Sequence, residues 1–119
     1  MITVVLSRDD KKSARGFKIS GHSSYDVSGR DIICAAISVL GQTAIASLLE
    51  LTELKVDHRI DEKNAVLECK VIMPGDLEKS EYIKASAILD SFEIGCRNTA
   101  DSYGRKYINI IEHHGLGGV

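Results

Sequence analysis

The sequence lacks several features that would indicate a specialised class of protein. It has one proline, no large excess of charge of either sign, and only three cysteines. A composition that is 44% hydrophobic and 27% charged excludes collagen-like, low-complexity and disordered chains. By inspection, no apolar run approaches the ~20 residues that a membrane span requires, and no secretory leader opens the chain. We therefore expect a cytoplasmic protein that does not bind membranes.

The charge and the cysteines also limit the expected partners and cofactors. Fifteen basic residues against 17 acidic ones give a formal net charge of -2, so we expect no direct nucleic-acid binding. The cysteines Cys34, Cys69 and Cys96 are odd in number and lack Cys-x-x-Cys spacing. This pattern favours neither a disulfide framework nor a metal site, and we expect no cofactor. The pair His113-His114 is only weak evidence for a metal ligand.

The 119 residues fit one compact domain, which we place at residues 1–112 with a flexible tail at 113–119. The spacing of apolar and turn residues predicts the order β-β-α-β-β-α-β. In chain order, we expect strands at 2–7 and 15–20, a helix at 31–53, strands at 55–61 and 65–72, a second helix between Asp76 and Gly104, and a strand at 105–112. This order predicts an α+β fold in which two helices cover a mainly antiparallel sheet.

The first predicted helix has two apolar lines instead of one. Its core stripe recurs at steps of three and four residues and comprises Ile33, Ile37, Leu40, Ala44, Leu48 and Leu51. Its second apolar line comprises Ala35, Val39, Ala46 and Leu49. Because one sheet cannot cover both lines, we expect a homodimer that forms through helices; a helix wedged in the middle of one subunit is the alternative.

The second predicted helix has a single apolar stripe, with Asp76 as a possible N-cap and Gly104 at its end. The stripe comprises Tyr82, Ala85, Leu89, Phe92, Cys96, Ala100 and Tyr103. Cys96 is therefore expected in the core. Cys69 alternates with other apolar strand residues and is expected there too. His58 is expected to be a partly buried sheet residue.

Cys34 and His22 are the residues with the clearest potential for chemistry. If Asp31 is the N-cap, Cys34 lies in the first helical turn, where free N–H groups and the helix dipole favour a negative charge. The dipole contributes only about 0.3–1 kcal/mol, which does not by itself ionise a thiol at neutral pH. An imidazolium from His22, at the end of the second strand, would supply the rest, as in a Cys–His nucleophile pair.

Several other residues are candidates for supporting roles. First-turn N–H groups, including that of Cys34, are expected to hold an oxyanion. Asp31 either caps the helix or orients His22, and Asp26 is a second candidate for that orienting role. Ser38, four residues after Cys34, lies on the same helix edge and can hydrogen-bond the sulfur or the imidazole.

The polar loop at 21–30 is long for so small a domain, and such loops often carry function. We expect its residues 23–30 to form part of a substrate cleft, with Ser23, Tyr25, Asp26 and Gly29 as the candidate residues. Tyr25 can contact an aromatic substrate side chain, although an ordinary loop tyrosine is an equal interpretation. From spacing alone, three ordinary interpretations also remain open: Cys34 as a small buried residue, His22 as a surface residue and Asp31 as a helix cap.

Gly21-His22, Gly29 and the stretch Asp31-Ile32-Ile33-Cys34-Ala35-Ala36-Ile37-Ser38 resemble the signature of the ribosomal-processing cysteine protease family, Prp. The resemblance covers essentially the whole chain. It implies that Cys34 is the nucleophile and His22 its base, and that Gly21, Asp31 and Ser38 are recurrent family positions. A third catalytic member stays open between Asp31, Asp26 and none.

The resemblance also implies a homodimer that removes the N-terminal extension of large-subunit ribosomal protein L-twenty-seven. Cleavage would follow a pair of phenylalanines and proceed through a covalent acyl-enzyme. Two alternatives belong to other classes of protein. One is a non-catalytic, dimeric, ribosome-associated binding module, and the other is a thiol redox sensor, which lacks an evident resolving cysteine.

Overall fold

The structure, a computed structural model, describes residues 1–21, 28–72 and 78–114, without the side chains of residues 28–31. The elements in chain order are β1 (Ile2–Arg8), β2 (Ala14–Ser20), α1 (Ser28–Leu51), β3 (Lys55–Asp61), β4 (Val66–Ile72), α2 (Lys79–Tyr103), the 3-10 turn η1 (Arg105–Tyr107) and β5 (Ile108–His114). The predicted order β-β-α-β-β-α-β is therefore confirmed.

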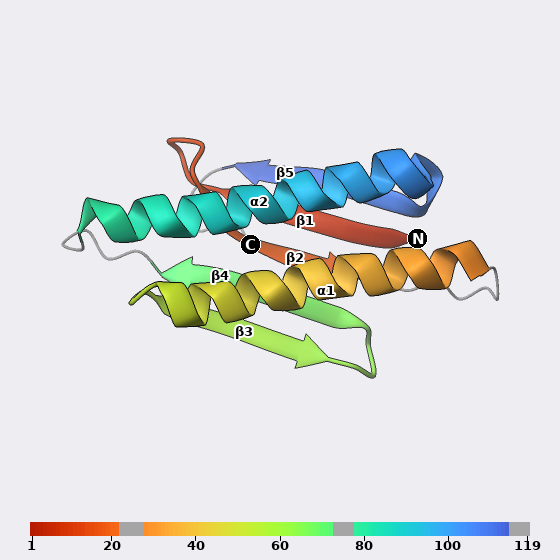
Figure 1. Cartoon of the computed structure of the whole chain (residues 1–119), viewed down its shortest axis with the longest axis horizontal. Coiled ribbons are helices and arrows are strands. Elements are labelled where there is room, and N and C mark those ends of the chain that lie inside the picture. The colour runs from red at the N-terminus through yellow and green to blue at the C-terminus, as the bar shows by residue number, and fades with distance from the viewer. Residues whose placement is uncertain (22–27, 73–77, 115–119) are drawn as a thin grey trace.

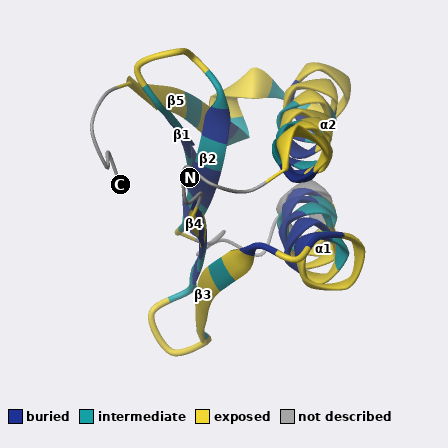
Figure 2. Cartoon of the chain, turned by 90° about the vertical axis from the view of Figure 1, so that its left-hand side faces the viewer, coloured by how far each residue is buried: buried dark blue, intermediate teal, exposed yellow. Residues whose placement is uncertain are grey.

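The five strands form one sheet in the order β3-β4-β2-β1-β5. Three neighbouring pairs are antiparallel, and β5 is parallel to β1. Both helices lie on the same face of this sheet and run antiparallel to each other (Figures 1 and 2). The molecule is thus a two-layer α+β structure, and the predicted fold class is confirmed.

The core lies between the sheet and the two helices, where apolar side chains from both layers meet. The Phe17 ring of β2 stacks on the Phe92 ring of α2, with centroids 4.0 Å apart. Two glycines permit close approach: a Cβ at Gly41 would come within 2.7 Å of β2 and β4 side chains. A Cβ at Gly95 would come within 2.7 Å of the Leu40 side chain, so α1 and α2 pack tightly together.

Several element ends differ from their predicted positions, and residues 105–107, predicted as part of the last strand, form the 3-10 turn η1. Helix α1 begins at Ser28, so Asp31 is its fourth residue and not its N-cap. In α2 the N-cap position belongs to Glu78, without a side-chain capping bond, and Asp76 lies outside the described residues. Strand β5 reaches His114, because it pairs with β1 along its whole length. The last five residues, 115–119, also lie outside the described part.

Several predictions of burial were wrong at the ends of elements and at the sheet edge. Leu51 is 59% exposed at the last residue of α1, and Tyr103 is 56% exposed at the last residue of α2. His58 is exposed because β3 is an edge strand. By contrast, Gly104 ends α2 as predicted, since its φ is +131° and its N–H donates to the Ala100 carbonyl at 2.9 Å.

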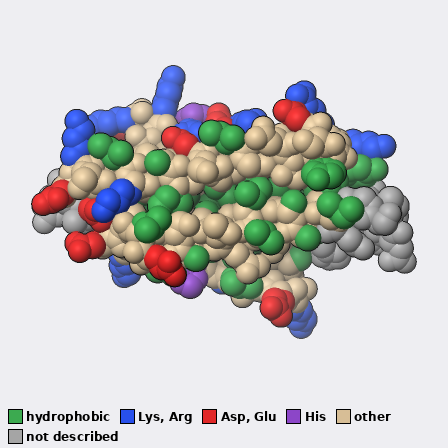
Figure 3. Space-filling model, in the orientation of Figure 1, with side chains coloured by type: hydrophobic (Ala, Val, Ile, Leu, Met, Phe, Trp, Pro, Cys, Tyr) green, Lys and Arg blue, Asp and Glu red, His purple; other side chains and the backbone are tan. Residues whose placement is uncertain are grey.

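The outer face of α1 corrects the expectation that no segment is apolar enough to span a membrane. Residues Ile32–Leu51 have a mean hydropathy of 2.1 over 20 residues and pass that test by length and composition. One side of this segment packs in the core, and the other leaves apolar side chains exposed on the helix face of the molecule (Figure 3). The exposed apolar residues of the two helices that form this helix face include Ile32, Ala35, Val39, Ala46, Leu49 and Leu51 of α1 and Ile83, Ala87 and Ile94 of α2.

Candidate active site

Cys34 lies on the wall of a cleft at the end of the sheet where β1 begins and β2 ends. Its side chain is half-buried and packs against the core. The cleft has a volume of about 280 Å³ and is enclosed by α1, the ends of β1 and β2, and the β3–β4 hairpin. Its lining residues are Ile2, Ile19, Gly21, Cys34, Ile37, Ser38, Gln42, Ile60, Asp61, Glu62, Ala65, Val66 and Leu67.

Helix α1 contributes a row of three polar or thiol side chains to this cleft. Cys34, Ser38 and Gln42 follow one another at four-residue steps and therefore share one side of the helix. Gln42 Nε2 donates a hydrogen bond to Ser38 Oγ at 2.9 Å. Ser38 was predicted as a supporting residue, whereas Gln42 was not, although its spacing from Cys34 was a usable signal.

The β3–β4 hairpin, which was predicted from the sequence, forms the opposite lip of the cleft, a role that was not predicted. Asp61 holds this turn together, because its carboxylate accepts hydrogen bonds from the Asn64 side chain at 2.8 Å and backbone N–H at 3.1 Å. These bonds lower the pKa of Asp61 below its ordinary value. Ile60, an exposed apolar residue directly before a turn, was the available sequence signal for this lip.

Gly21 connects the cleft to the predicted catalytic histidine. Its φ is +87°, and a Cβ at this position would lie 2.4 Å from the Met1 carbonyl oxygen, so only glycine fits. His22, the next residue, lies outside the described part of the chain, as do Ser23, Tyr25 and Asp26.

Gly29 and Asp31 belong to the first turns of α1, where side chains are not described. The structure therefore brings Gly21, Cys34 and Ser38 to one cleft. The pairing of His22 with Cys34 stays a prediction.

The prediction that the Cys34 N–H belongs to an oxyanion hole in the first helical turn is wrong. Because α1 begins at Ser28, Cys34 is its seventh residue. Only the first four N–H groups of a helix lack a partner within it, and the dipole effect fades beyond the first turn. The Cys34 amide thus lies inside the helix, and oxyanion donors must come from other groups.

The other two thiols lie in a different environment. Cys69 and Cys96 are 1% and 0% exposed and belong to the core, as predicted. Burial raises the pKa of each to about 12, which keeps both thiols protonated at neutral pH. Cys69 borders another pocket, of about 260 Å³, over β3 and β4, but it is itself buried; Cys34 is the half-buried thiol of the three and lines the cleft at the end of the sheet.

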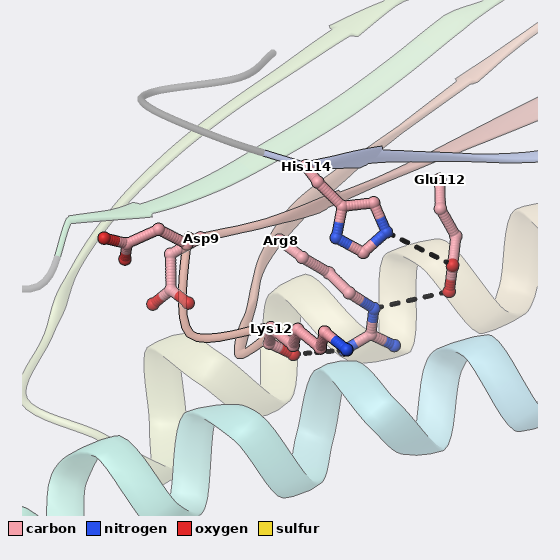
Figure 4. Close-up of a pocket in the computed structure, with 6 residues that line it drawn as sticks. Arg8, Asp9, Lys12, Glu112 and His114 are labelled. Atoms are coloured by element: carbon pink, nitrogen blue, oxygen red, sulfur yellow. Dashed lines mark hydrogen bonds and ion pairs between the residues drawn. The ribbon is translucent and has the colours of Figure 1, made fainter.

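A second pocket, of about 800 Å³, lies at the far end of the sheet and is lined by charged residues (Figure 4). Arg8 at the end of β1 forms an ion pair with Glu93 of α2. Its guanidinium also donates to Glu112 of β5 at 3.4 Å and to the Lys12 carbonyl at 3.0 Å. His114 Nε2 lies 3.4 Å from the Glu112 carboxylate. Through these contacts, Arg8 joins β1 to β5 and α2. Its role is therefore structural.

Comparisons with known proteins agree with this fold. A Prp ribosomal processing protease from S. aureus, in complex with a substrate peptide, superposes with a TM-score of 0.76 at 19% identity and covers 96% of this chain and 99% of its own. The same protease with a covalently linked product peptide gives a TM-score of 0.77 at 21% identity, covering 95% of this chain and 100% of its own. SMU.848 from Streptococcus mutans gives 0.76 at 24% identity, covering 96% of this chain and 95% of its own.

A comparison with curated proteins gave no match. The sequence profile of the family described as Cysteine protease Prp matches residues 1–109, nearly the whole length of the domain. With a half-buried cysteine on the wall of a cleft in the corresponding fold, the chain belongs to the Cysteine protease Prp family.

Proposed function

We propose that this chain is a cytoplasmic endopeptidase that removes the N-terminal extension of ribosomal protein L-twenty-seven, with Cys34 as nucleophile and His22 as base. The carrying observation is that Cys34 and Gly21 line the same cleft. Gly21 directly precedes His22 in the sequence. The S. aureus proteases with bound substrate and linked product peptides support a peptide substrate.

In the proposed reaction, His22 accepts the Cys34 thiol proton, and the thiolate attacks the scissile carbonyl carbon. The tetrahedral intermediate collapses to a thioester as His22 gives that proton to the leaving amine. A water molecule, deprotonated by His22, then attacks the thioester and releases the carboxylic acid and the thiol. The Ser38 hydroxyl, one helical turn beyond Cys34, supplies a donor on the reacting side of α1.

The walls of the cleft support an apolar substrate segment. Its base is formed by buried apolar side chains, and Ile60 is exposed at its lip. The residues of the base are Ile2, Ile19, Ile37 and Leu67. An apolar cavity of about 150 Å³ is sufficient to hold a benzene ring. A cleft of about 280 Å³ with these walls therefore suits a phenylalanine side chain next to the bond that is cleaved.

The proposed activity is tested by mass spectrometry of an extension-bearing L-twenty-seven before and after incubation with the protein. We expect one cut after the phenylalanine pair with the wild type, and none with Cys34→Ala or His22→Ala. Cys69→Ala is the matched control, since it removes a thiol from the core and leaves the cleft intact. Undiminished cleavage by Cys34→Ala would contradict the proposal.

We also propose that the helix face pairs with the same face of a second copy. Val39, 62% exposed, and Ile94, 60% exposed, are too apolar to favour contact with water, and both helices contribute to the face. Val39→Lys is expected to shift the molar mass measured by light scattering from dimer to monomer. Ile111→Lys is the control, because Ile111 is an exposed residue of strand β5 and not of a helix; this variant should remain dimeric. A monomeric wild type would contradict this proposal.

A further inference from the structure

The cleft is lined by three polar side chains that the Cys–His reaction does not use, namely Gln42, Asp61 and Glu62, and only Gln42 belongs to the same helix as Cys34. Gln42 is exposed on α1 and lines the cleft two helical turns beyond Cys34. Its Nε2 donates one hydrogen bond to Ser38 Oγ at 2.9 Å. Within the described residues, its second N–H and its Oε1 have no partner. The carboxamide is therefore fixed through one atom and open to a ligand through the others.

The spacing along α1 gives the part of a substrate that Gln42 can reach. A helix rises 1.5 Å per residue, so the Cα atoms of Cys34 and Gln42 are separated by about 12 Å along its axis. The Gln42 side chain leans toward the helix start and shortens that separation. An extended peptide advances about 3.3 Å per residue. A peptide with its scissile carbonyl at Cys34 that runs along α1 therefore passes Gln42 two or three residues away.

The chemistry of the cleft indicates which group of the peptide Gln42 binds. Peptide N–H and C=O groups that enter an apolar cleft lose water and need hydrogen-bond partners. The Asp61 carboxylate across the cleft is already occupied by Asn64. A carboxamide offers both a donor and an acceptor, which matches the two polar groups of a peptide main chain.

Building on the proposed peptidase function, we propose that Gln42 is a substrate-binding residue that holds the main chain of an extended peptide two or three residues from the scissile bond. Its Oε1 accepts a hydrogen bond from a peptide N–H, and its free Nε2 hydrogen donates to a peptide carbonyl. The bond to Ser38 fixes the orientation of the carboxamide. The cleft thereby binds a substrate by its backbone as well as by its apolar side chains.

Calorimetric titration of the Cys34→Ala protein with the extension peptide tests this assignment, because that variant holds the peptide without cleaving it. Adding Gln42→Ala is expected to weaken binding about three- to tenfold for each of the two hydrogen bonds that it removes. Peptides with a single N-methylated amide locate the contact. One N-methyl group, two or three residues from the scissile bond, should weaken binding by a similar factor and cost nothing further in Gln42→Ala.

Asn98→Ala is the matched control, since it removes an exposed carboxamide from α2 and should leave binding unchanged. If the Gln42–Ser38 hydrogen bond were purely structural, Gln42→Ala would lower the melting temperature without changing peptide affinity. Unchanged affinity in Gln42→Ala would overturn the inference. It would also be overturned if every N-methyl group weakened binding to Gln42→Ala by as much as it weakens binding to the protein that keeps Gln42. In cleavage assays, Gln42→Ala should raise KM and keep kcat. An active wild type with an unaffected variant overturns the inference alone, whereas an inactive wild type overturns the proposed function as well.

Discussion

The two ends of the five-stranded sheet are held together by different forces. At one end, Arg8 draws α2 and β5 together through carboxylates, and a polar turn at Asp9 closes the β1–β2 hairpin (Figure 4). At the other end, apolar side chains line an open cleft beside Cys34. At the charged end, the polar groups form hydrogen bonds and ion pairs with one another. The cleft end leaves polar groups for a substrate, so stability and function are separated along the molecule.

The largest expected effect on stability belongs to the charged end. Arg8→Met leaves Glu93, whose side chain is 15% exposed, without its main partner and should lower the free energy of unfolding by about 3 kcal/mol. Cleavage below the melting temperature should be unchanged. Arg97→Met, which removes a partner that is 48% exposed, is the control and should cost about 0.5 kcal/mol. Equal losses in urea unfolding of both variants would break the comparison.

At the cleft end, Gly21→Ala should damage both stability and activity. The left-handed backbone costs an alanine about 1–2 kcal/mol, and its Cβ would clash with the Met1 carbonyl. Because Gly21 lines the cleft, kcat/KM should fall about tenfold or more. Ser20→Ala, one residue earlier in β2, should change neither quantity greatly. Full activity in Gly21→Ala would mean that the geometry of this turn does not shape the site.

The pH dependence of stability should report the burial of a core thiol. Burial raises the pKa of Cys69 from 9.0 to about 12, so the folded chain keeps a proton that the unfolded chain releases. This stability is fully present below about pH 9 and is lost as the pH rises toward 12. Urea unfolding of Cys69→Ala should show a shallower decline across this window than the wild type. An unchanged decline would contradict the burial argument.

The smallest expected effects come from one turn at each end. Lys12 and Ala65 adopt φ values of +66° and +53°, which glycine tolerates better than other residues. Lys12→Gly and Ala65→Gly should each raise the free energy of unfolding by about 0.5 kcal/mol. Ala65 lines the cleft, so only Ala65→Gly should also change KM. A change of KM in Lys12→Gly would show that the two ends are coupled.

The sequence predicted the element order because strand alternation, helical stripes and turn residues are local signals. It misplaced the start of α1, because Asp31 is an attractive N-cap and the helix extends three residues before it. It also ended the last strand too early, since pairing with β1 carries β5 as far as His114. Both errors concern boundaries that tertiary contacts decide and that local propensity does not.

The candidate site was predictable where it lies close in sequence to Cys34 and unpredictable where it does not. Gly21 and Ser38 came from spacing and from the family resemblance, and both reach the cleft. The lip at Ile60 comes from a hairpin some 25 residues away, and only the sheet order places it there. The helical spacing of Gln42 from Cys34 was a usable signal for it, but the cleft that gives this spacing a meaning is visible only in the structure.

The most direct test of the central claim is to trap the covalent intermediate on the wild-type protein. Rapid acid quenching during cleavage, followed by mass spectrometry of proteolytic fragments, locates the acyl group. The account predicts a mass increase, equal to the acyl part of the substrate, on the fragment that contains Cys34 and on neither of those with Cys69 or Cys96. Cleavage without any adduct on Cys34, or an adduct on one of the core thiols, would contradict it.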